Sequence, residues 1–469
     1  ATSDKQVLMG SERLHLDDAV DLGPVVETPV ARFGMYSCMD GVINETPRGL
    51  ALRGAQVLLN SLNSFALDEA SLHIPVRAPE NRVWIVAANK VGPLVPEGTI
   101  EIVSQGVGVP PDRLHGAGES QVVAPDGRVV VRGPRVGQAV VVADIDVAEA
   151  DRKTRPDGTD VYASRRPELY GPLADEPRGR TAPSGADVVT AAVVQGADDD
   201  LDLVVALVRE ALEDGANLVV LPELAGFRDG VVPGDGEPAL VAARARAEAV
   251  VAALRGVLAG TDAVVVTSLP SPQGPPAHEG VVVAADGVLA RQAQLHRTAR
   301  HPWVEHLGDG VVPVDLPWGR LVVVVGDDAV YPETFRLAAL ADAEVVALPF
   351  ALQEAWELET GLVERAAENR VNLVAATRPT GVGASLVADL PSDFTLWGQW
   401  QAPFAGVISY PDLLLVPADA AVAVVDVHPA QAANRFVSRG TDLVDGRPWT
   451  LLEAIVSPDP STVGPRVGT

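Results

Sequence analysis

The chain has 469 residues, of which 47% are hydrophobic and 4% aromatic, and its formal net charge is −27 at pH 7. This length predicts roughly two to three domains with large cores, and the acidity disfavours nucleic acid and anionic membranes as partners. The single cysteine excludes a disulfide within the chain, so a reducing compartment would not destabilise it. No apolar run reaches the roughly 18 residues that span a bilayer. From these two features we expect a cytoplasmic protein.

The first part of the chain alternates short apolar runs with polar turns and helical stretches. The patterns predict two strands within 24–38, strands over 56–60, 83–88 and 139–145, helices over 46–54 and 78–83, and a hairpin between 118 and 131. Buried strands that alternate with helices indicate a mixed sheet covered by helices.

The second part begins after residues 173–186, whose Pro, Gly and charged residues are typical of a linker. The patterns there predict strands over 188–195, 217–224 and 263–268, helices over 201–213 and 239–258, and a hairpin around Asp286-Gly287. The last dozen residues are rich in Pro, Ser and Gly, which predicts a frayed tail.

The two parts repeat each other at an offset of 288 positions. Residues 32–48 have the same layout as 320–336, and Arg-Ala-Pro-Glu-Asn-Arg at 77–82 recurs as Arg-Ala-Ala-Glu-Asn-Arg. An offset kept over such a distance indicates tandem duplication of a domain. Cys38 corresponds to Gly326, and glycine offers no nucleophile, so only one copy can use cysteine chemistry.

Cys38 ends an apolar run with strand character and precedes a polar turn and a helical stretch. A nucleophile on a strand-to-helix turn is exposed at the end of the sheet, beside free backbone N–H groups. A lone cysteine is also often a buried structural residue. The cysteine by itself leaves both readings open.

An ordered set of motifs identifies a family. The motifs are Ala-Val-Val-Gln195, Leu-Pro-Glu223-Leu, the Cys38-x-Asp turn with Glu-Thr-Pro-Arg, Arg-Ala-x-Glu-Asn-Arg and Arg-Arg-Pro-Glu-Leu-Tyr170. Together they resemble the nitrilase superfamily of carbon–nitrogen hydrolases. The resemblance implies an α/β fold, the αββα sandwich of that superfamily, in two tandem copies. It divides the chain into 1–172, the C-terminal portion of one domain, a linker at 173–186, a degenerate domain at 187–456 and a tail at 457–469.

The resemblance also implies a cofactor-free Glu–Lys–Glu–Cys active site. His15 and His73 have no metal-ligand spacing, so we expect no metal site. In residues 1–172, the first copy, the resemblance assigns Cys38 as the nucleophile, Lys5 and Glu12 as the lysine and the second glutamate, and the N–H of Met39 as an oxyanion donor. In the family the catalytic base is the glutamate of a Leu-Pro-Glu strand. The residues before Lys5 contain no such strand. We therefore expect an upstream segment or separate chain to complete the first copy.

In residues 187–456, the second copy, Glu223 matches the base and Glu305 the second glutamate, whereas Thr298 and Gly326 replace the lysine and the cysteine. The resemblance thus implies a pseudoenzyme domain. Family members pair through their helical faces, so we expect oligomers of this kind, and a tandem can form such a pair within one chain. Residues that both copies retain are expected to be framework: Asp40, Glu45, Arg48, Glu80 and Asn81.

Three functional hypotheses follow. The first is a cysteine-dependent hydrolase of a small amide or N-carbamoyl compound, acting through a covalent thioester and releasing ammonia. The second is a catalytically inactive scaffold or ligand-binding subunit of a larger complex, because one copy lacks its nucleophile and the other its base. The third, in which Glu223 serves Cys38 in trans, requires the second copy's sheet to open.

Overall fold

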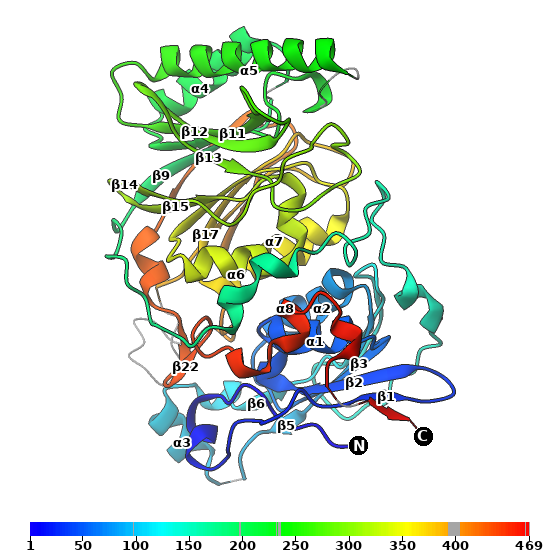
Figure 1. The fold of residues 1–469 in the computed structure, drawn as a ribbon. Helices are drawn as coiled ribbons and strands as arrows, with labels where there is room; N and C mark the ends of the chain where they lie inside the picture. The colour runs from blue at the N-terminus through cyan, green and yellow to red at the C-terminus, as the bar shows by residue number, and fades with distance from the viewer. Residues whose placement is uncertain are drawn as a thin grey trace.

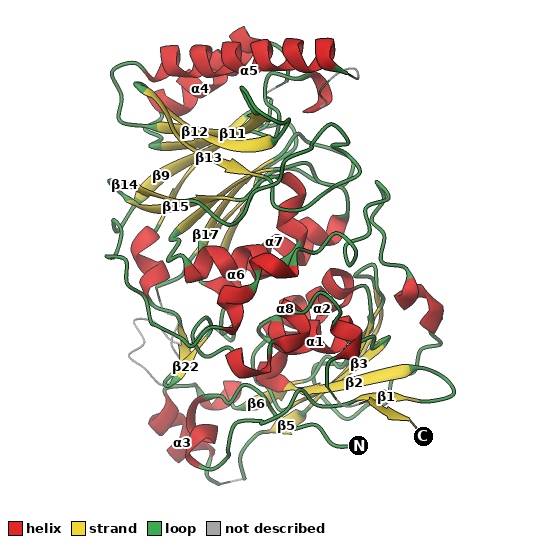
Figure 2. Ribbon diagram, in the orientation of Figure 1, coloured by secondary structure: helices red, strands yellow, loops and turns green. Residues whose placement is uncertain are grey.

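The computed structural model describes residues 1–96, 98–196, 198–230, 232, 236–392, 404–464 and 466–468. The fold is α/β: helices cover sheets in both copies, and the two copies stack with their helices between them (Figures 1 and 2). None of the described helices combines the length and the apolar character needed to cross a membrane.

The first copy holds one large sheet, to which the C-terminal strand β23 (Arg466–Gly468) adds an edge. Its strands, in spatial order, are β23, β1 (Val25–Glu27), β2 (Arg32–Ser37), β3 (Val57–Leu62), β4 (Trp84–Asn89), β7 (Gln121–Val123) and β8 (Val129–Arg132). Helices α1 (Glu45–Leu52) and α2 (Ile74–Asn81) cover one face, where Leu50, Leu58 and Ile85 are fully buried. A small hairpin and a helix lie beside this sheet: β5 (Val91–Pro93), β6 (His115–Ala117) and α3 (Ile100–Val107).

The second copy is a complete sandwich of two six-stranded sheets. One sheet has the order β13 (Gly287–Ala293), β12 (His278–Ala284), β11 (Val264–Pro270), β10 (Leu218–Val220), β9 (Val189–Val194) and β20 (Val422–Val427). The other has the order β14 (Pro313–Leu316), β15 (Gly319–Val323), β16 (Val345–Pro349), β17 (Asn372–Ala376), β18 (Leu386–Asp389) and β19 (Asp412–Leu415). Valine and alanine side chains fill the space between them.

Helices cover both outer faces of this sandwich. Helices α4 (Leu201–Glu213) and α5 (Glu237–Leu258) cover the β9–β13 sheet, and α6 (Pro332–Leu340) and α7 (Leu362–Asn369) cover the β14–β19 sheet (Figure 2). Helix α4 has apolar residues at helical spacing on one side, and Asp200 caps its start by accepting N–H groups from the first turn. The layers follow the αββα order that the resemblance implies.

The duplication extends to the pairing of individual residues. In the first copy Phe33 pairs with Val57, and Val57 with Trp84. In the second copy the residues 288 positions later, 321, 345 and 372, pair in the same parallel register. The sheet of the first copy therefore corresponds to the β14–β19 sheet. The described part of the first copy contains no counterpart of the β9–β13 sheet.

The helical faces of the two copies pack against each other within the one chain, α1 and α2 against α6 and α7 (Figure 1). Arg48 donates to both carboxylate oxygens of Glu333 (2.8 and 3.2 Å), and Arg336 donates to both oxygens of Glu45 (2.7 and 3.3 Å). The two pairs are exchanged by the 288-residue offset, as expected of a pseudo-twofold axis. All four side chains are buried, so these retained residues are framework.

A second reciprocal set lies beside the first. Arg77 donates to Glu80 in its own helix (2.9 Å) and to Glu368 in the other copy (2.9 Å). Its counterpart Arg365 bonds to Glu368 in its own helix and to Glu80 across the interface. A buried charge is stable only when it is paired with an opposite charge or hydrogen-bonded, and here each arginine finds one carboxylate in its own copy and another in the other copy.

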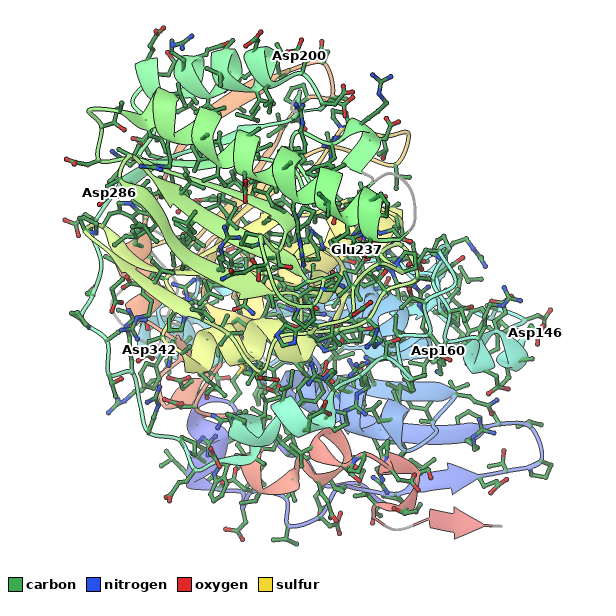
Figure 3. All side chains as sticks on the ribbon, turned by 45° about the horizontal axis from the view of Figure 1, so that its top comes forward. Asp146, Asp160, Asp200, Glu237, Asp286 and Asp342 are labelled. Carbon is green, nitrogen blue, oxygen red and sulfur yellow. The ribbon has the colours of Figure 1, made fainter. Side chains whose placement is uncertain are left out.

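Each copy also sends its last segment over the other. Residues 152–170 leave the first copy and contact the second; Asp160, labelled in Figure 3, caps a turn there by accepting the N–H groups of Tyr162 (2.8 Å) and Ala163 (2.9 Å). The linker follows the second copy, where Arg180 pairs with Glu344 (2.6 Å). Residues after 428 return to the first copy and form β21 (Phe436–Ser438), β22 (Thr441–Asp442) and α8 (Glu453–Val456), with α8 against α1.

Two expectations are wrong. The described residues of the tail are ordered against the first copy. Strand β23 pairs in parallel with β1, because the edge of the first sheet offers unpaired backbone groups. The carbonyl of Val463 also accepts a hydrogen bond from Arg53 (2.8 Å). Residues 139–145 form no strand. They run as a strap in which Ala143 and Ile145 pack on the sheet face opposite the helices, whereas Val140 and Val142 are exposed.

Candidate active site

The nucleophile position lies where β2 ends. Cys38 follows Ser37, begins a short 3-10 helix (Cys38–Gly41) and has φ of 53°, a left-handed conformation that costs a non-glycine residue energy. Its N–H donates to Oδ1 of Asn60 on β3 (3.2 Å), and its side chain is partly buried. Gly326 has the same φ of 53° at the matching position. The turn that presents the cysteine is thus retained in the copy that lacks it.

Lys5 and Glu12, which lie far from Cys38 in sequence, come together next to its turn. The Lys5 Nζ atom is 2.6 Å from Glu12 Oε2, and the same oxygen accepts the N–H of Met9 (2.8 Å). The positive charge of Lys5 acts on the Cys38 thiol by lowering its pKa. The structure therefore brings together the cysteine, lysine and glutamate that the resemblance assigns, and Met39 follows Cys38 in the same short helix.

The environment of the thiol does not by itself produce a thiolate. Burial is the largest influence and raises the pKa of Cys38, which reaches about 11, and the carboxylate of Glu69 adds to the rise. Lys5 and the N–H of Asn63 oppose it. At neutral pH this thiol is protonated, and nucleophilic attack requires a base that removes the proton.

Asp40 joins the lysine segment to the cysteine turn. One carboxylate oxygen accepts the N–H groups of 6–7 (2.9 and 2.7 Å), and the other accepts the N–H of Ser37 (3.1 Å). Asp328 in the second copy accepts the N–H groups of 295–296 (2.7 and 2.8 Å), one on each carboxylate oxygen. Gln294 directly precedes that pair as Lys5 precedes 6–7, so the structure places Gln294, and not the expected Thr298, at the lysine position. Asp40 is therefore a framework residue that positions the segment carrying Lys5.

In the second copy the base position is occupied by an internal ion pair. Glu223 follows β10, and Arg300 donates to both of its oxygens (2.5 and 3.0 Å). Burial alone would raise the pKa of Glu223, but Arg300 outweighs it and holds the carboxylate ionised. A Cβ atom on Gly326 would lie 2.7 Å from Glu223 Oε2, so a side chain here would require this carboxylate to shift from its place beside Arg300.

A second arginine enters this site from the first copy. Arg155 is 1% exposed and donates to Asp327 (2.6 Å) and to Glu357 (2.6 Å). Arg300 also binds Asp327 through Nε (3.0 Å), and Thr298 donates to it through its hydroxyl (2.7 Å). The space that the resemblance assigns to a lysine and a substrate is filled here by two arginines and their carboxylates.

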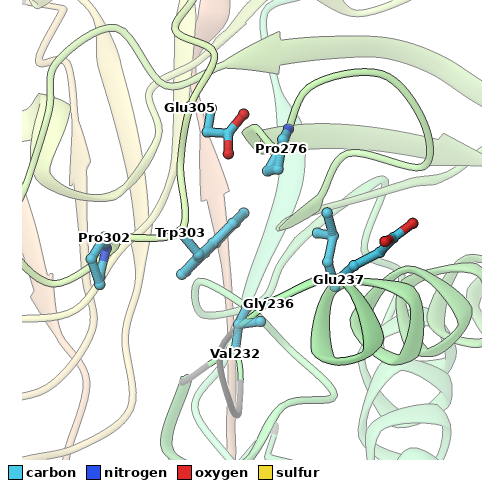
Figure 4. A pocket seen from close by; sticks show the side chains of 8 residues that line it. Val232, Gly236, Glu237, Pro276, Pro302, Trp303 and Glu305 are labelled. Atoms are coloured by element: carbon cyan, nitrogen blue, oxygen red, sulfur yellow. The ribbon is translucent and has the colours of Figure 1, made fainter.

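Sequence reasoning missed two members of this network. Asp327 occupies the position that matches Met39, and a charged residue in place of methionine was the available signal. Arg155 carried no signal, because the sequence does not show which loop crosses to the other copy. Glu305 does not join the network around Glu223: it is exposed and lines a surface pocket of about 420 Å³ with Trp303 (Figure 4).

Three side chains of the second copy could in principle hold a metal ion. Glu223, His278 and His301 are buried, and their ligand atoms lie within 4.8 Å of one another. The side chain of His278 is engaged by Gln294 (2.8 Å) and Ser268 (2.7 Å), and burial lowers its pKa to about 3. Because Arg300 pairs with Glu223, a guanidinium already supplies the positive charge at this cluster.

Known proteins match both copies. The family model described as carbon-nitrogen hydrolase matches residues 4–154 and 190–394, which together are more than half of the chain. Among curated relatives, a protein named nitrilase from Pyrococcus abyssi is 29% identical over 151 residues, 32% of this chain and 51% of that protein. N-carbamoylputrescine amidase of Solanum tuberosum is 29% identical over 158 residues, 31% of this chain and 48% of that protein.

The chain thus spans about half the length of the curated relatives that it matches. Among solved structures, an amidase from Nesterenkonia sp. is 24% identical and superposes with a TM-score of 0.39, covering 55% of this chain and 96% of that one. The two family-model matches coincide with the two copies that the motifs and the strand register define. The chain belongs to the carbon-nitrogen hydrolase family, in the nitrilase superfamily.

Proposed function

We propose that this protein is a cysteine-dependent hydrolase of a small amide or N-carbamoyl compound. The observation that carries the proposal is Cys38 on its strained turn, with the Lys5–Glu12 pair beside it. The Cys38 sulfur attacks the carbonyl carbon, Lys5 and the N–H of Met39 stabilise the negative charge on the oxygen, and the C–N bond breaks. Ammonia leaves with a proton from the base, and water then hydrolyses the thioester.

The base comes from a part that completes the first copy. In the second copy Glu223 belongs to the β9–β13 sheet, which covers the β14–β19 sheet. We propose that an equivalent half-sandwich, either an upstream segment or a separate chain, covers the sheet of the first copy and brings a glutamate to Cys38. Such a carboxylate can take the thiol proton, so the high pKa of Cys38 is compatible with catalysis in the completed site.

The exposure of equivalent side chains supports this completion. On the second copy's covered sheet, Ala347, Val374 and Ala376 are each 0% exposed. Their counterparts 288 positions earlier are Leu59 and Val86, which are partly exposed, and Ala88, which is exposed. Apart from the strap at 139–145, the described structure places no layer on this apolar sheet face, which favours association with one.

For the second copy we propose a pseudoenzyme role as a scaffold that pairs with the first through the helical faces. Glu223 serving Cys38 in trans is disfavoured, because its side chain is buried and bound by Arg300. An inactive scaffold or ligand-binding subunit remains the alternative for the whole chain, and the pKa of about 11 for Cys38 is the observation that favours it.

The test is ammonia release from a panel of aliphatic amides and N-carbamoyl amines, by the protein purified from its natural source with any co-purifying chain. Cys38→Ala and Lys5→Met should abolish turnover, and Glu12→Gln should reduce it strongly. Glu305→Gln is the control, since Glu305 is exposed, lines a surface pocket of the second copy and should be dispensable. Turnover that survives Cys38→Ala would refute the hydrolase, and a fully inactive native assembly would favour the scaffold.

A further inference from the structure

The second copy reaches the lysine segment of the first copy through one buried hydroxyl. Thr441 lies on β22 and is 0% exposed. Its Oγ1 accepts the N–H of Gly10 (2.8 Å) and donates to the carbonyl of Leu8 (3.2 Å). Both bonds fall on the stretch that separates Lys5 from Glu12. The threonine therefore fixes the backbone between the two charged residues of the candidate site.

The first copy makes the matching contact in the opposite direction. Thr159 accepts the N–H of Ala299 (2.8 Å) and lies 3.4 Å from the Thr298 hydroxyl. Both threonines occur in a Gly-Thr-Asp sequence, at 158–160 and 440–442. Each copy thus places a threonine on the other copy's lysine segment, but in the second copy Gln294 stands at the position equivalent to Lys5.

The element that carries Thr441 is itself held firmly. Asp442 accepts the N–H groups of 444–445 (2.7 Å each), and β22 pairs with β21. Leu443 packs in a buried apolar cluster with Val7 and Met39 of the first copy. A hydrogen bond from a rigid, packed element restricts the backbone it contacts more than a bond from a mobile loop would.

We propose that Thr441 is a positioning residue for the first-copy active site. By holding residues 8–10 it keeps the Lys5–Glu12 pair close to Cys38, so the copy without a nucleophile supplies part of the geometry of the copy that has one. This inference rests on the proposed function only for its catalytic consequence. The effect on the thiol can be measured in the chain itself, because Lys5 lowers the pKa of Cys38.

The experiment measures the rate of Cys38 alkylation by iodoacetamide at a fixed pH near 9, where rate follows the thiolate fraction. Thr441→Val keeps the side-chain shape but removes the hydroxyl, and it should lower the rate roughly three- to tenfold as Lys5 moves away. Thr441→Ser should restore the rate. Thr159→Val makes the same change in the other Gly-Thr-Asp loop and should leave the rate unaltered.

Two further measurements separate positioning from a general loss of structure. Lys5→Met should slow alkylation by a similar factor, and the Lys5→Met/Thr441→Val double variant should be no slower than either single variant. Hydrogen exchange at the Gly10 amide should quicken in Thr441→Val and not in Thr441→Ser, even if the valine variant is less stable overall.

Wild-type alkylation in Thr441→Val together with faster exchange at Gly10 would overturn the proposal, as would fully additive effects of the two substitutions. Equal slowing in Thr159→Val would also overturn it, because the effect would then not be specific to the first site. Failure of the proposed function appears separately, as ammonia release that persists in Cys38→Ala, and leaves the alkylation comparison valid.

Discussion

The reciprocal ion pairs between the copies predict an unequal response to two equivalent substitutions. Arg336→Met leaves Glu45 as a buried carboxylate, since both side chains of this pair are 0% exposed. Removing one partner of a buried pair costs about 3–5 kcal/mol of unfolding free energy. We expect a loss in that range for Arg336→Met.

Arg48→Met should cost less, although Arg48 is the counterpart of Arg336. The carboxylate that it leaves, Glu333, retains a second cation, because Arg165 lies 3.6 Å away. Burial alone would raise the pKa of Glu333, but Arg48 and then Arg165 lower it to about 2. With Arg165 still present, we expect a loss smaller by roughly 1–2 kcal/mol.

Urea unfolding followed by tryptophan fluorescence measures both losses, and urea leaves the ion pairs unscreened. The double variant Glu45→Gln/Arg336→Met removes the orphaned charge and should regain at least about 2 kcal/mol relative to Arg336→Met. If Arg48→Met costs as much as Arg336→Met, or if the double variant regains nothing, then pairing of the buried charges does not account for the contribution of these residues to the unfolding free energy.

Three further predictions concern single positions. Alkylation of Cys38 in this chain should have a midpoint near pH 11, and binding of a glutamate-bearing half-sandwich should lower it, as a pH–rate profile would show. Gly326→Ala should cost about 1–3 kcal/mol in urea unfolding, because φ is 53° and the new Cβ meets Glu223, whereas Gly215→Ala, also at positive φ but in open space, should cost less. Burial raises the pKa of Glu69 to about 7, so the native state binds its proton more tightly than the unfolded chain does. Its stabilising contribution is complete below about pH 4.5 and is lost as the pH rises through 7, and Glu69→Gln should flatten this part of the stability profile.

Local sequence patterns predicted the elements well where local chemistry determines them. The helix predicted over 201–213 matches α4 residue for residue, because an N-cap aspartate and an Asp-Gly stop define its ends. The 288-residue offset predicted equivalent strands, and the register follows it. The strap at 139–145 was mistaken for a strand because it lies across a sheet face, on which Ala143 and Ile145 pack, and does not pair at an edge.

The candidate site was also predicted only where motifs within one copy determine it. Motifs located Cys38, Lys5 and Glu12, and the fold brings the three together. The contacts made by Arg155 and Thr441 could not be predicted, since both cross between copies and depend on how the copies pack. Sequence spacing describes one domain at a time, whereas these contacts belong to the pair.

The packing of the copies explains why the second site could change while its framework did not. Gly326 keeps the 53° turn without the strain of a side chain, and Arg300 neutralises Glu223, so the altered site satisfies its own charges. The framework has no such freedom. Four buried arginines, Arg48, Arg77, Arg336 and Arg365, each pair with a glutamate of the other copy. Loss of Glu333 would leave Arg48 of the first copy without its carboxylate partner. The second copy can lose its chemistry at little cost, but it cannot lose the helical face on which the first copy depends.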